Sequence, residues 1–325
     1  LKTAALHTGK PGVLAFTGAY QGLAYGALSV TDRAHFRAPF EAQLNPHVAW
    51  AGYPHPYRPP RRPGFPEPPA HPDEVAEAAL AEVERVLDGE AGRRVGAVIV
   101  EPVQGRGGDV APPRGFLASL AGMCRERDRL LILDEVYTGF GRTGRRFACL
   151  EDGVLPDLLC VGKGFSGGMP MSACLGRREV VDAWPASEGE AIHTSTFLGH
   201  PLACAAALAT LEVLEEEELA DRARELGRWW RDELRSMAEA HDLVGEVRGR
   251  GLMIGLDLVS DPAARTPAGE AAGRVVKAAL RRGWILLAGG PEGNVLSLSP
   301  PLTVPREVLE AATGALDEAL AEAEG

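Results

Sequence analysis

Residues 130–144 read Leu-Leu-Ile-Leu-Asp-Glu-Val-Tyr-Thr-Gly-Phe-Gly-Arg-Thr-Gly, and residues 156–164 read Pro-Asp-Leu-Leu-Cys-Val-Gly-Lys-Gly. Each stretch is a short apolar run that ends in one ionisable residue, Asp134 or Lys163, followed by glycine-rich chain. Short apolar runs between turn signals are typical of buried strands in a parallel sheet. Because ligand sites in open α/β sheets lie at the carboxyl ends of the strands, we predict that Asp134 and Lys163 meet in one crevice.

An acid that keeps a pyridine nitrogen protonated and a lysine that forms a Schiff base are the groups that pyridoxal phosphate chemistry requires. Simpler interpretations are a turn or helix-capping role for Asp134 and a solvated side chain for Lys163. A Walker-type phosphate loop is excluded, because Gly164 follows Lys163 and Asp157 stands where the loop needs its first glycine. The pyridoxal phosphate interpretation is therefore preferred.

Four ordered motifs resemble those of the class III aminotransferases, which depend on pyridoxal phosphate. The family run Asp-Glu-Val-x-Thr-Gly-x-Gly-Arg-Thr-Gly is similar to Asp134–Gly144, and its lysine segment to Pro156–Gly164. Glu-Pro-x-Gln-Gly matches Glu101–Gly105, and His-x-Ser-Thr-x-x-Gly-x-Pro-Leu-Ala resembles His193–Ala203. The resemblance covers essentially the whole sequence and implies an α/β protein of fold type I. That fold has a large domain, with a mostly parallel sheet flanked by helices, and a smaller C-terminal α/β lobe.

The resemblance implies roles around the cofactor ring. Asp134 holds the ring nitrogen protonated, and Lys163 carries the cofactor and then moves a proton as a free amine. Val136 points to the same face of the strand end as Asp134 and packs on the ring. Tyr20 stacks on the opposite ring face; its alternative is an ordinary half-buried tyrosine at a strand end.

Further contacts are implied at the edge of the ring and at the phosphate. Glu101, Gln104 and Tyr137 join the hydrogen bonds near the cofactor's 3-hydroxyl group. Thr196, with Ser195 as a weaker candidate, matches a family threonine that reaches the phosphate in the neighbouring subunit. This match implies a homodimer with shared active sites. A simple turn before the helix that begins at Pro201 is the alternative for Thr196.

Two departures from the family pattern concern the substrate. Ser297 stands where members that use amino acids commonly carry an arginine for the α-carboxylate, and Arg106 stands where many carry a glutamate. We interpret this as a cation moved across the pocket, so that Arg106 binds the substrate carboxylate through its two-pronged guanidinium. The alternative is that Arg106 points to solvent. The loss of the arginine favours an amine or ω-amino acid as donor and a keto acid as acceptor.

Composition limits the other possibilities. The 325 residues are 45% hydrophobic and 24% charged, as in ordinary globular enzymes. A net charge of −11 argues against nucleic acid and anionic membrane surfaces as partners. The five cysteines are scattered without zinc-binding spacing, so we expect reduced core cysteines, no metal site and a cytoplasmic protein. No apolar run reaches membrane-spanning length, and no signal peptide is visible.

With the fold that the resemblance implies, we expect a large domain over residues 1–218 and a smaller one over 219–325. Residues 246–258 read as one strand, and the proline-rich residues 44–72 read as extended loop. Its Arg58, Arg61 and Arg62 are expected to be solvated, with contacts near the pocket as the alternative. Remaining strands are expected at 13–16, 95–100, 130–134, 285–288 and 294–298, and helices at 74–89, 113–128, 201–217, 219–241, 268–281 and 305–324.

Other reactions remain open on the same cofactor, namely decarboxylating transamination and an aminomutase reaction, because pocket shape selects the bond that breaks. The resemblance also implies a preceding family segment that contributes to the phosphate cup, which the sequence does not contain. A non-catalytic family member is therefore the remaining alternative.

Overall fold

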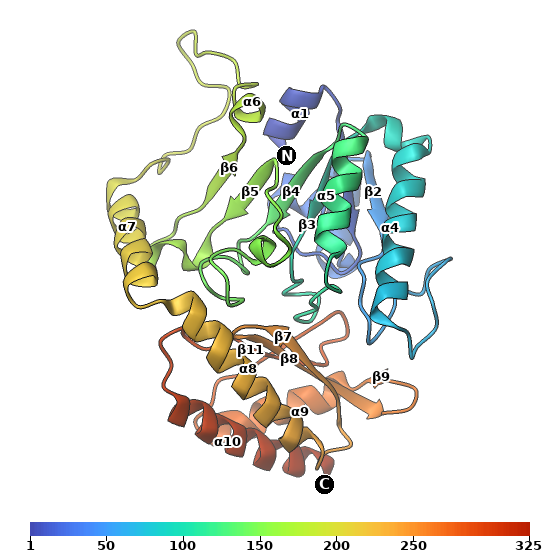
Figure 1. Cartoon of the computed structure of the whole chain (residues 1–325), viewed down its shortest axis with the longest axis vertical. Coiled ribbons are helices and arrows are strands. Elements are labelled where there is room, and N and C mark those ends of the chain that lie inside the picture. Colours follow the sequence, from blue (N-terminus) through green and yellow to red (C-terminus); the bar gives the residue numbers. More distant parts are fainter.

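A six-stranded sheet forms the centre of the larger part of the computed structural model, which describes residues 1–325 (Figure 1). Its strand order is β2-β1-β3-β4-β5-β6. The first five strands are parallel and β6 runs antiparallel at the edge, which confirms the mostly parallel sheet. The strands are β1 Gly12–Phe16, β2 Val48–Ala51, β3 Val95–Val100, β4 Leu130–Asp134, β5 Leu158–Val161 and β6 Ala173–Gly176.

Helices cover both faces of this sheet, which explains why its strands are continuous apolar runs. Leu131 and Leu133 of β4 pack in one cluster with residues of α4 and α5, whereas Leu130 and Ile132 pack in another with residues of α1 and α6. The helices of this part are α1 Lys2–Thr8, α2 Tyr25–Ser29, α3 Ala34–Arg37, α4 Pro72–Asp88, α5 Phe116–Glu126, α6 Arg178–Val181 and α7 Pro201–Glu216.

The C-terminal part is a smaller lobe with its own sheet and core. Its main strand order is β10-β11-β8-β7, all antiparallel, and β9 pairs with β8. All 22 residues of its buried cluster lie between Ala223 and Ala323. We therefore propose domains at residues 1–218 and 219–325. Limited proteolysis between α7 and α8 would test this boundary. The elements are α8 Leu219–Ala238, β7 Val244–Arg250, β8 Met253–Asp261, β9 Thr266–Pro267, α9 Gly269–Arg281, β10 Leu287–Gly289, β11 Val295–Leu298 and α10 Arg306–Glu324.

Two sequence predictions about strands are wrong. Residues 246–258 do not form one strand, because β7 and β8 are a hairpin in which Arg250 pairs with Met253. Gly251 takes φ +55 in the turn, a left-handed conformation that glycine adopts without strain. The proline-rich region is also not all loop, since Val48–Ala51 pairs with β1 at the sheet edge. An edge position lets a strand lie next to proline-rich chain.

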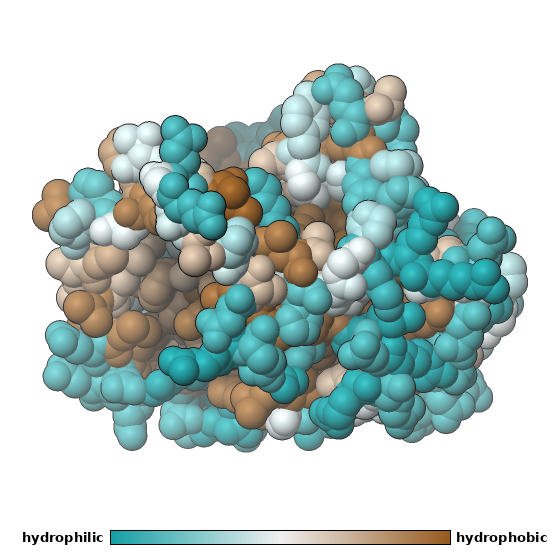
Figure 2. Space-filling model, turned by 90° about the horizontal axis from the view of Figure 1, so that it is seen from above, coloured by the Kyte–Doolittle hydropathy of each residue, from teal (hydrophilic) through white to brown (hydrophobic).

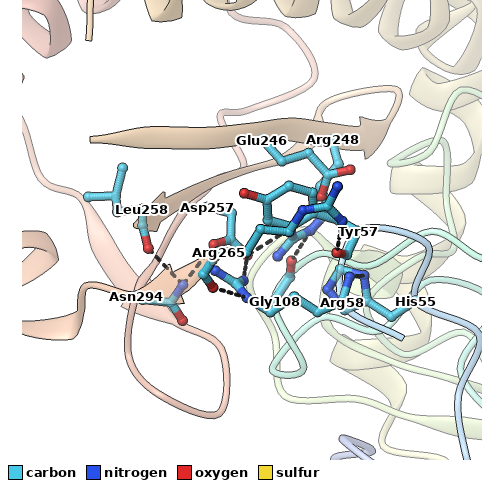
Figure 3. Close-up of polar contacts among 10 residues, drawn as sticks. All are labelled: His55, Tyr57, Arg58, Gly108, Glu246, Arg248, Asp257, Leu258, Arg265 and Asn294. Carbon is cyan, nitrogen blue, oxygen red and sulfur yellow. Dashed lines mark hydrogen bonds and ion pairs between the residues drawn. The ribbon is translucent and has the colours of Figure 1, made fainter. Parts of the chain in front are cut away.

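The prediction that the three arginines are solvated is wrong for Arg58 and Arg62. Arg62 forms an ion pair with the buried Glu82, with Arg62 Nη2 2.7 Å from Glu82 Oε1. Arg58 forms an ion pair with the buried Asp257 of β8, so it joins the two lobes (Figure 3). Only Arg61 is exposed as expected. The acidic partners lie far along the chain, where no local pattern indicates them.

Asp257 is the centre of the polar cluster between the lobes that Figure 3 shows. Arg248 of β7 donates to Asp257 Oδ2 at 2.9 Å, and its Nε donates to the Gly108 carbonyl oxygen at 2.8 Å. Burial, together with the charges of Arg248 and Arg58, holds the pKa of His55 well below its usual value. Through the hydrogen bond from Arg248 to the Gly108 carbonyl oxygen, the small lobe fixes the loop that follows β3.

None of the helices combines the length and the apolar character needed to cross a membrane.

Candidate active site

The carboxyl ends of β3, β4 and β5 bring three ionisable side chains together. The register pairs Val100 with Leu133 and Asp134 with Cys160, so Glu101, one residue beyond β3, lies beside Asp134. Lys163 begins a short 3₁₀ helix directly after β5. It lines a cavity of about 510 Å³ with Val136, Tyr137 and other residues. The structure therefore places Asp134 and Lys163 at one edge of the sheet, as the strand pattern indicated.

Asp134 ends β4 with its carboxyl group largely buried. Its Oδ1 accepts a hydrogen bond from the Val136 backbone N–H at 3.0 Å, whereas Oδ2 has no hydrogen bond within the chain. Burial raises the pKa of Asp134 to about 6, and the Val136 N–H and the charge of Lys163 oppose this rise. A cationic N–H beside Oδ2 would further favour the carboxylate, because an opposite charge lowers an acid's pKa.

Lys163 is held in an unusual backbone conformation between Gly162 and Gly164. Its φ is +48, a region that costs a non-glycine residue about 1 kcal/mol or more. Its Nζ lies 4.2 Å from the ring centroid of Tyr137. Desolvation lowers the pKa of Lys163 despite its exposed position, and Arg106 acts in the same direction while Asp134 and Glu101 oppose it. A lowered pKa increases the fraction of neutral amine, which is the nucleophilic form.

Glu101 connects two loops beneath the crevice. Its Oε1 accepts from the Tyr20 backbone N–H at 2.9 Å, and its Oε2 accepts from the Gly105 N–H at 3.0 Å. Burial raises the pKa of Glu101 to about 8, and the neighbouring Asp134 charge adds to this rise. Glu101 therefore positions the segments that carry Tyr20 and Arg106.

The other predicted residues are distributed around this centre. The Arg106 guanidinium carbon lies 5.3 Å from the centroid of the Tyr20 ring, and Arg106 is exposed. The Tyr137 hydroxyl group hydrogen-bonds to Ser299 Oγ of the small lobe at 2.9 Å. Gln104 is buried against the β1 loop, where its Nε2 donates to the Thr17 carbonyl oxygen at 2.8 Å. Gln104 is not among the residues that line the Lys163 cavity.

Thr196 is not brought to the Lys163 cavity within one chain. It is exposed in the segment between α6 and α7, and it does not line that cavity. Figure 1 shows this segment as an extended arm that projects beyond the edge strand β6. Within one chain, the arm therefore does not bring Thr196 to the Lys163 cavity.

Sequence reasoning missed the structural role of Glu135. This fully buried carboxylate accepts from the Cys149 N–H at 2.8 Å and from the Ala148 N–H at 3.0 Å. It also accepts from Thr138 Oγ1 at 2.5 Å. Glu135 thus holds the glycine-rich segment after Asp134 in place. An acid directly after a buried strand was the available signal.

A second missed residue is Asp109, whose side chain is fully buried next to Ser297. Its φ is +53, and burial raises the pKa of Asp109 to about 7, opposed by the Ser297 hydroxyl group and the Arg248 charge. Where the family commonly has an arginine, this chain therefore has a serine beside a buried acid. A lone acid in a glycine-rich loop gives no sequence signal for burial.

The donor set fits the ring end of pyridoxal phosphate. Asp134 offers a free carboxylate oxygen for a ring N–H, and Lys163 offers an amine with a lowered pKa for an aldehyde. The cavity of about 510 Å³ lies in the range of small-molecule sites. Thr210 and Thr303 also line it.

A carboxylate and a lysine at the ends of adjacent parallel strands, with a second α/β lobe against them, define the class of pyridoxal-phosphate-dependent transferases of fold type I. Within this class, the family model for aminotransferase class-III matches residues 1–320, and the chain belongs to that family.

Similar proteins carry several names within this family. The 4-aminobutyrate aminotransferase of Mycobacterium leprae is 38% identical over 312 residues, covering 95% of this chain and 67% of that protein. The alanine/serine racemase of Pyrococcus horikoshii is 36% identical over 323 residues, covering 98% of this chain and 66% of the relative. A solved amine transaminase from an uncultivated Pseudomonas species, in its pyridoxal-phosphate-bound form, has a TM-score of 0.90 and 35% identity, covering 99% and 73% of the two chains.

The raised pKa of Glu101 predicts a specific pH dependence of stability. The folded protein keeps a proton on Glu101 up to about pH 8, because its pKa is raised there, whereas the unfolded chain releases that proton near the ordinary glutamate pKa of about 4.5. This contribution to the free energy of unfolding is therefore full at low pH and is lost as the pH rises between these values. We expect the Tm of the cofactor-free protein to fall less steeply over that interval in Glu101→Gln than in the wild type.

The control is Glu77→Gln, because Glu77 is exposed on α4. Thermal unfolding of the three proteins would be followed by circular dichroism across the interval. Equal slopes for the wild type and Glu101→Gln would contradict the buried, protonated state of Glu101.

Proposed function

We propose that this chain is a pyridoxal-phosphate-dependent aminotransferase that transfers an amino group from an amine or ω-amino acid to a keto acid. The observation that carries the proposal is the placement of Asp134 and Lys163 at the ends of adjacent parallel strands, where Lys163 lines a cavity. The named activities of the 4-aminobutyrate aminotransferase and the amine transaminase support this choice of donors.

Asp134 and Lys163 have different roles around the cofactor. When bound, pyridoxal phosphate supplies an electron sink that acidifies the hydrogen on the amine-bearing carbon. We assign Asp134 to the ring nitrogen, where its carboxylate keeps a proton in place. Lys163 Nζ holds the cofactor and, as a neutral amine, takes the proton from the donor carbon. Its lowered pKa favours that neutral form.

The remaining assignments concern the orientation of the ring. We place Val136 and Tyr20 on opposite ring faces, where apolar and aromatic surfaces exclude water. Glu101, Gln104 and Tyr137 support the loops at its hydroxyl edge. The hydrogen bonds of Glu101 to the Tyr20 and Gly105 N–H groups support this role. The contact of Gln104 with Thr17 supports an indirect contribution through the β1 loop.

Replacement of Lys163 tests the function directly. We expect Lys163→Ala to reduce keto-acid-dependent transamination by about 10³-fold, because both cofactor attachment and proton transfer are lost. Conversion of a keto acid to its amino acid would be measured by mass spectrometry with a panel of amines and ω-amino acids. Lys277→Ala, an exposed lysine on α9, is the matched control. Wild-type rates in Lys163→Ala would refute the assignment.

The same assay separates the other reactions of the cofactor. A decarboxylating transaminase would release carbon dioxide from the donor, and an aminomutase would return an isomer of it. Racemisation, the activity in the name of the Pyrococcus horikoshii relative, would change the donor's configuration without net transfer. A non-catalytic family member would bind the cofactor without any turnover.

We further propose that Arg106 binds the carboxylate of the keto acid or ω-amino acid. Three observations support this. Arg106 is exposed, its charge contributes to the lowered pKa of Lys163, and its guanidinium group lies against the Tyr20 ring. Neither Ser297 nor the buried Asp109 can supply a competing cation. An exposed guanidinium group near the reacting amine can accept a carboxylate without burying an unpaired charge.

Kinetics of Arg106→Ala test this assignment. We expect the KM for keto acids to rise about tenfold or more, because a charge-assisted pair of hydrogen bonds is lost. The KM for an uncharged amine donor should stay within about twofold of the wild type. Arg114→Ala is the control, since Arg114 has 89% of its side chain exposed. An unchanged KM for keto acids would exclude Arg106 as the carboxylate-binding residue.

We propose a homodimer with shared active sites, in which Thr196 reaches the phosphate of the partner's cofactor. The arm and α7 carry exposed apolar side chains, and Figure 2 shows apolar residues gathered on the side where α7 lies. Such surfaces commonly mark interfaces. The exposed apolar side chains of the arm and α7 include Ile192, Phe197, Leu198, Leu202 and Leu208.

We also propose a cytoplasmic location, which the presence of only free cysteines supports.

Subunit complementation tests the shared site. Lys163→Ala and Thr196→Ala should each be impaired alone, because each damages one component of every site. When the two are mixed and reassociated, heterodimers should regain one intact site, giving about a quarter of wild-type activity from random pairing. Activity after mixing would be compared with that of each parent. No recovery from two folded, cofactor-binding variants would contradict sites built from two chains.

A further inference from the structure

Two cysteines face each other across the edge of the large sheet. The antiparallel register of β5 and β6 pairs Cys160 directly with Cys174. Opposed residues in such a pair have Cα atoms about 4.5–5.5 Å apart, within the range of about 4.4–6.8 Å that disulfides span. Both cysteines are free thiols. The strands therefore hold two thiols at a separation that a disulfide can bridge without backbone movement.

The two thiols differ in exposure and in acidity. Cys174 is exposed, whereas Cys160 is half-buried. The contact with the Cys160 thiol lowers the pKa of Cys174, and the same contact raises the pKa of Cys160. Cys174 is therefore the more accessible and the more acidic thiol of the pair, and thiolates are the form that peroxides oxidise. The exposure of Cys174 corrects the expectation that the cysteines are all core residues.

The other cysteines provide a contrast within the same chain. Cys124 and Cys149 are buried, and burial raises the pKa of both thiols above the usual value. No strand pairing places either of them opposite another cysteine. Oxidation by a hydroperoxide should therefore be selective for the pair on β5 and β6.

The pair is adjacent to the candidate active site. Cys160 is the register partner of Asp134 on one side and of Cys174 on the other, so the three residues form a row across β4, β5 and β6. The chain that joins β5 to β6 begins with Gly162 and Lys163. A bond between Cys160 and Cys174 would therefore close the loop that carries Lys163.

We propose that Cys160 and Cys174 form a redox-sensitive dithiol that a hydroperoxide oxidises to a disulfide, which clamps the loop bearing Lys163. The Cys174 thiolate attacks the peroxide oxygen, the O–O bond breaks, and the leaving oxygen takes a proton to form water or an alcohol. Cys160 then attacks the resulting sulfenic acid, so that the S–S bond forms and water leaves. The two sulfur atoms lose two electrons in total, and the peroxide gains them.

The clamp acts on a glycine-rich segment. Gly162, Gly164, Gly167 and Gly168 all lie between the two cysteines, and two of them, Gly167 and Gly168, have positive φ. A disulfide across the base of this segment reduces the conformations open to it. Amide hydrogens of residues 162–172 should therefore exchange more slowly in the oxidised protein than in the reduced protein.

Mass spectrometry of the peroxide-treated protein tests the proposal without cofactor or substrate, so its outcome is independent of the proposed function. We expect an intact mass lower by about 2 Da, a peptide linking Cys160 to Cys174, and reversal by dithiothreitol. Cys174→Ser and Cys160→Ser should each abolish the link, whereas Cys204→Ser, which removes a half-buried cysteine of α7, should leave it unchanged.

Hydrogen exchange gives the second readout on the same samples. Slower exchange of residues 162–172 after oxidation of the wild type, and not of Cys174→Ser, is the expected result. Oxidation of Cys174 to sulfinic acid without a link to Cys160 would overturn the proposal. Unchanged amide hydrogen exchange of residues 162–172, in protein in which Cys160 and Cys174 are fully linked, would contradict the proposal that the disulfide clamps the Lys163 loop.

Discussion

The parallel register of β3, β4 and β5 is the constraint on which the rest of the structure depends. It ends three buried strands at one edge of the sheet, so that Glu101, Asp134 and Lys163 leave the apolar core close to one another. Their partial desolvation raises the pKa values of the two acids and lowers that of the amine. Burying these groups is costly unless they are paired, and a cationic ring nitrogen bound to Asp134 would offset part of that cost.

The small lobe completes this edge through polar contacts and not through a shared hydrophobic core. Arg142 donates to the Leu252 carbonyl oxygen at 3.1 Å, and Tyr137 hydrogen-bonds to Ser299. Asp257 forms ion pairs with Arg58 of the large lobe and with Arg248 of the small lobe. Arg248 also donates a hydrogen bond to the Gly108 carbonyl oxygen. Such a buried charge is unfavourable without its partners, so the lobes and the loop that bears Arg106 are coupled.

The sequence predicts the parts of this design that local patterns encode. Short apolar runs indicate β3, β4 and β5, and their polar endings indicate Asp134 and Lys163. The turn between β7 and β8 escapes detection, because residues 246–258 contain three glycines and nothing in the sequence marks which of them lies at a turn. The ion pairs of Arg58 and Arg62 and the burial of Asp109 also depend on contacts between distant segments, such as the pairing of Arg58 with Asp257. Roles at the phosphate remain predictions, since Thr196 lies outside the Lys163 cavity.

The central claim is that Lys163 and Asp134 form one pyridoxal phosphate site whose occupant exchanges amino groups. A visible absorption titration of the purified protein with pyridoxal phosphate, followed by an amine or ω-amino acid, tests it most directly. We predict a visible band of protein-bound cofactor that is absent in Lys163→Ala and that converts to the absorption of the aminated cofactor when the donor is added. A band of equal strength and behaviour in Lys163→Ala, or no band at saturating cofactor, would contradict the account.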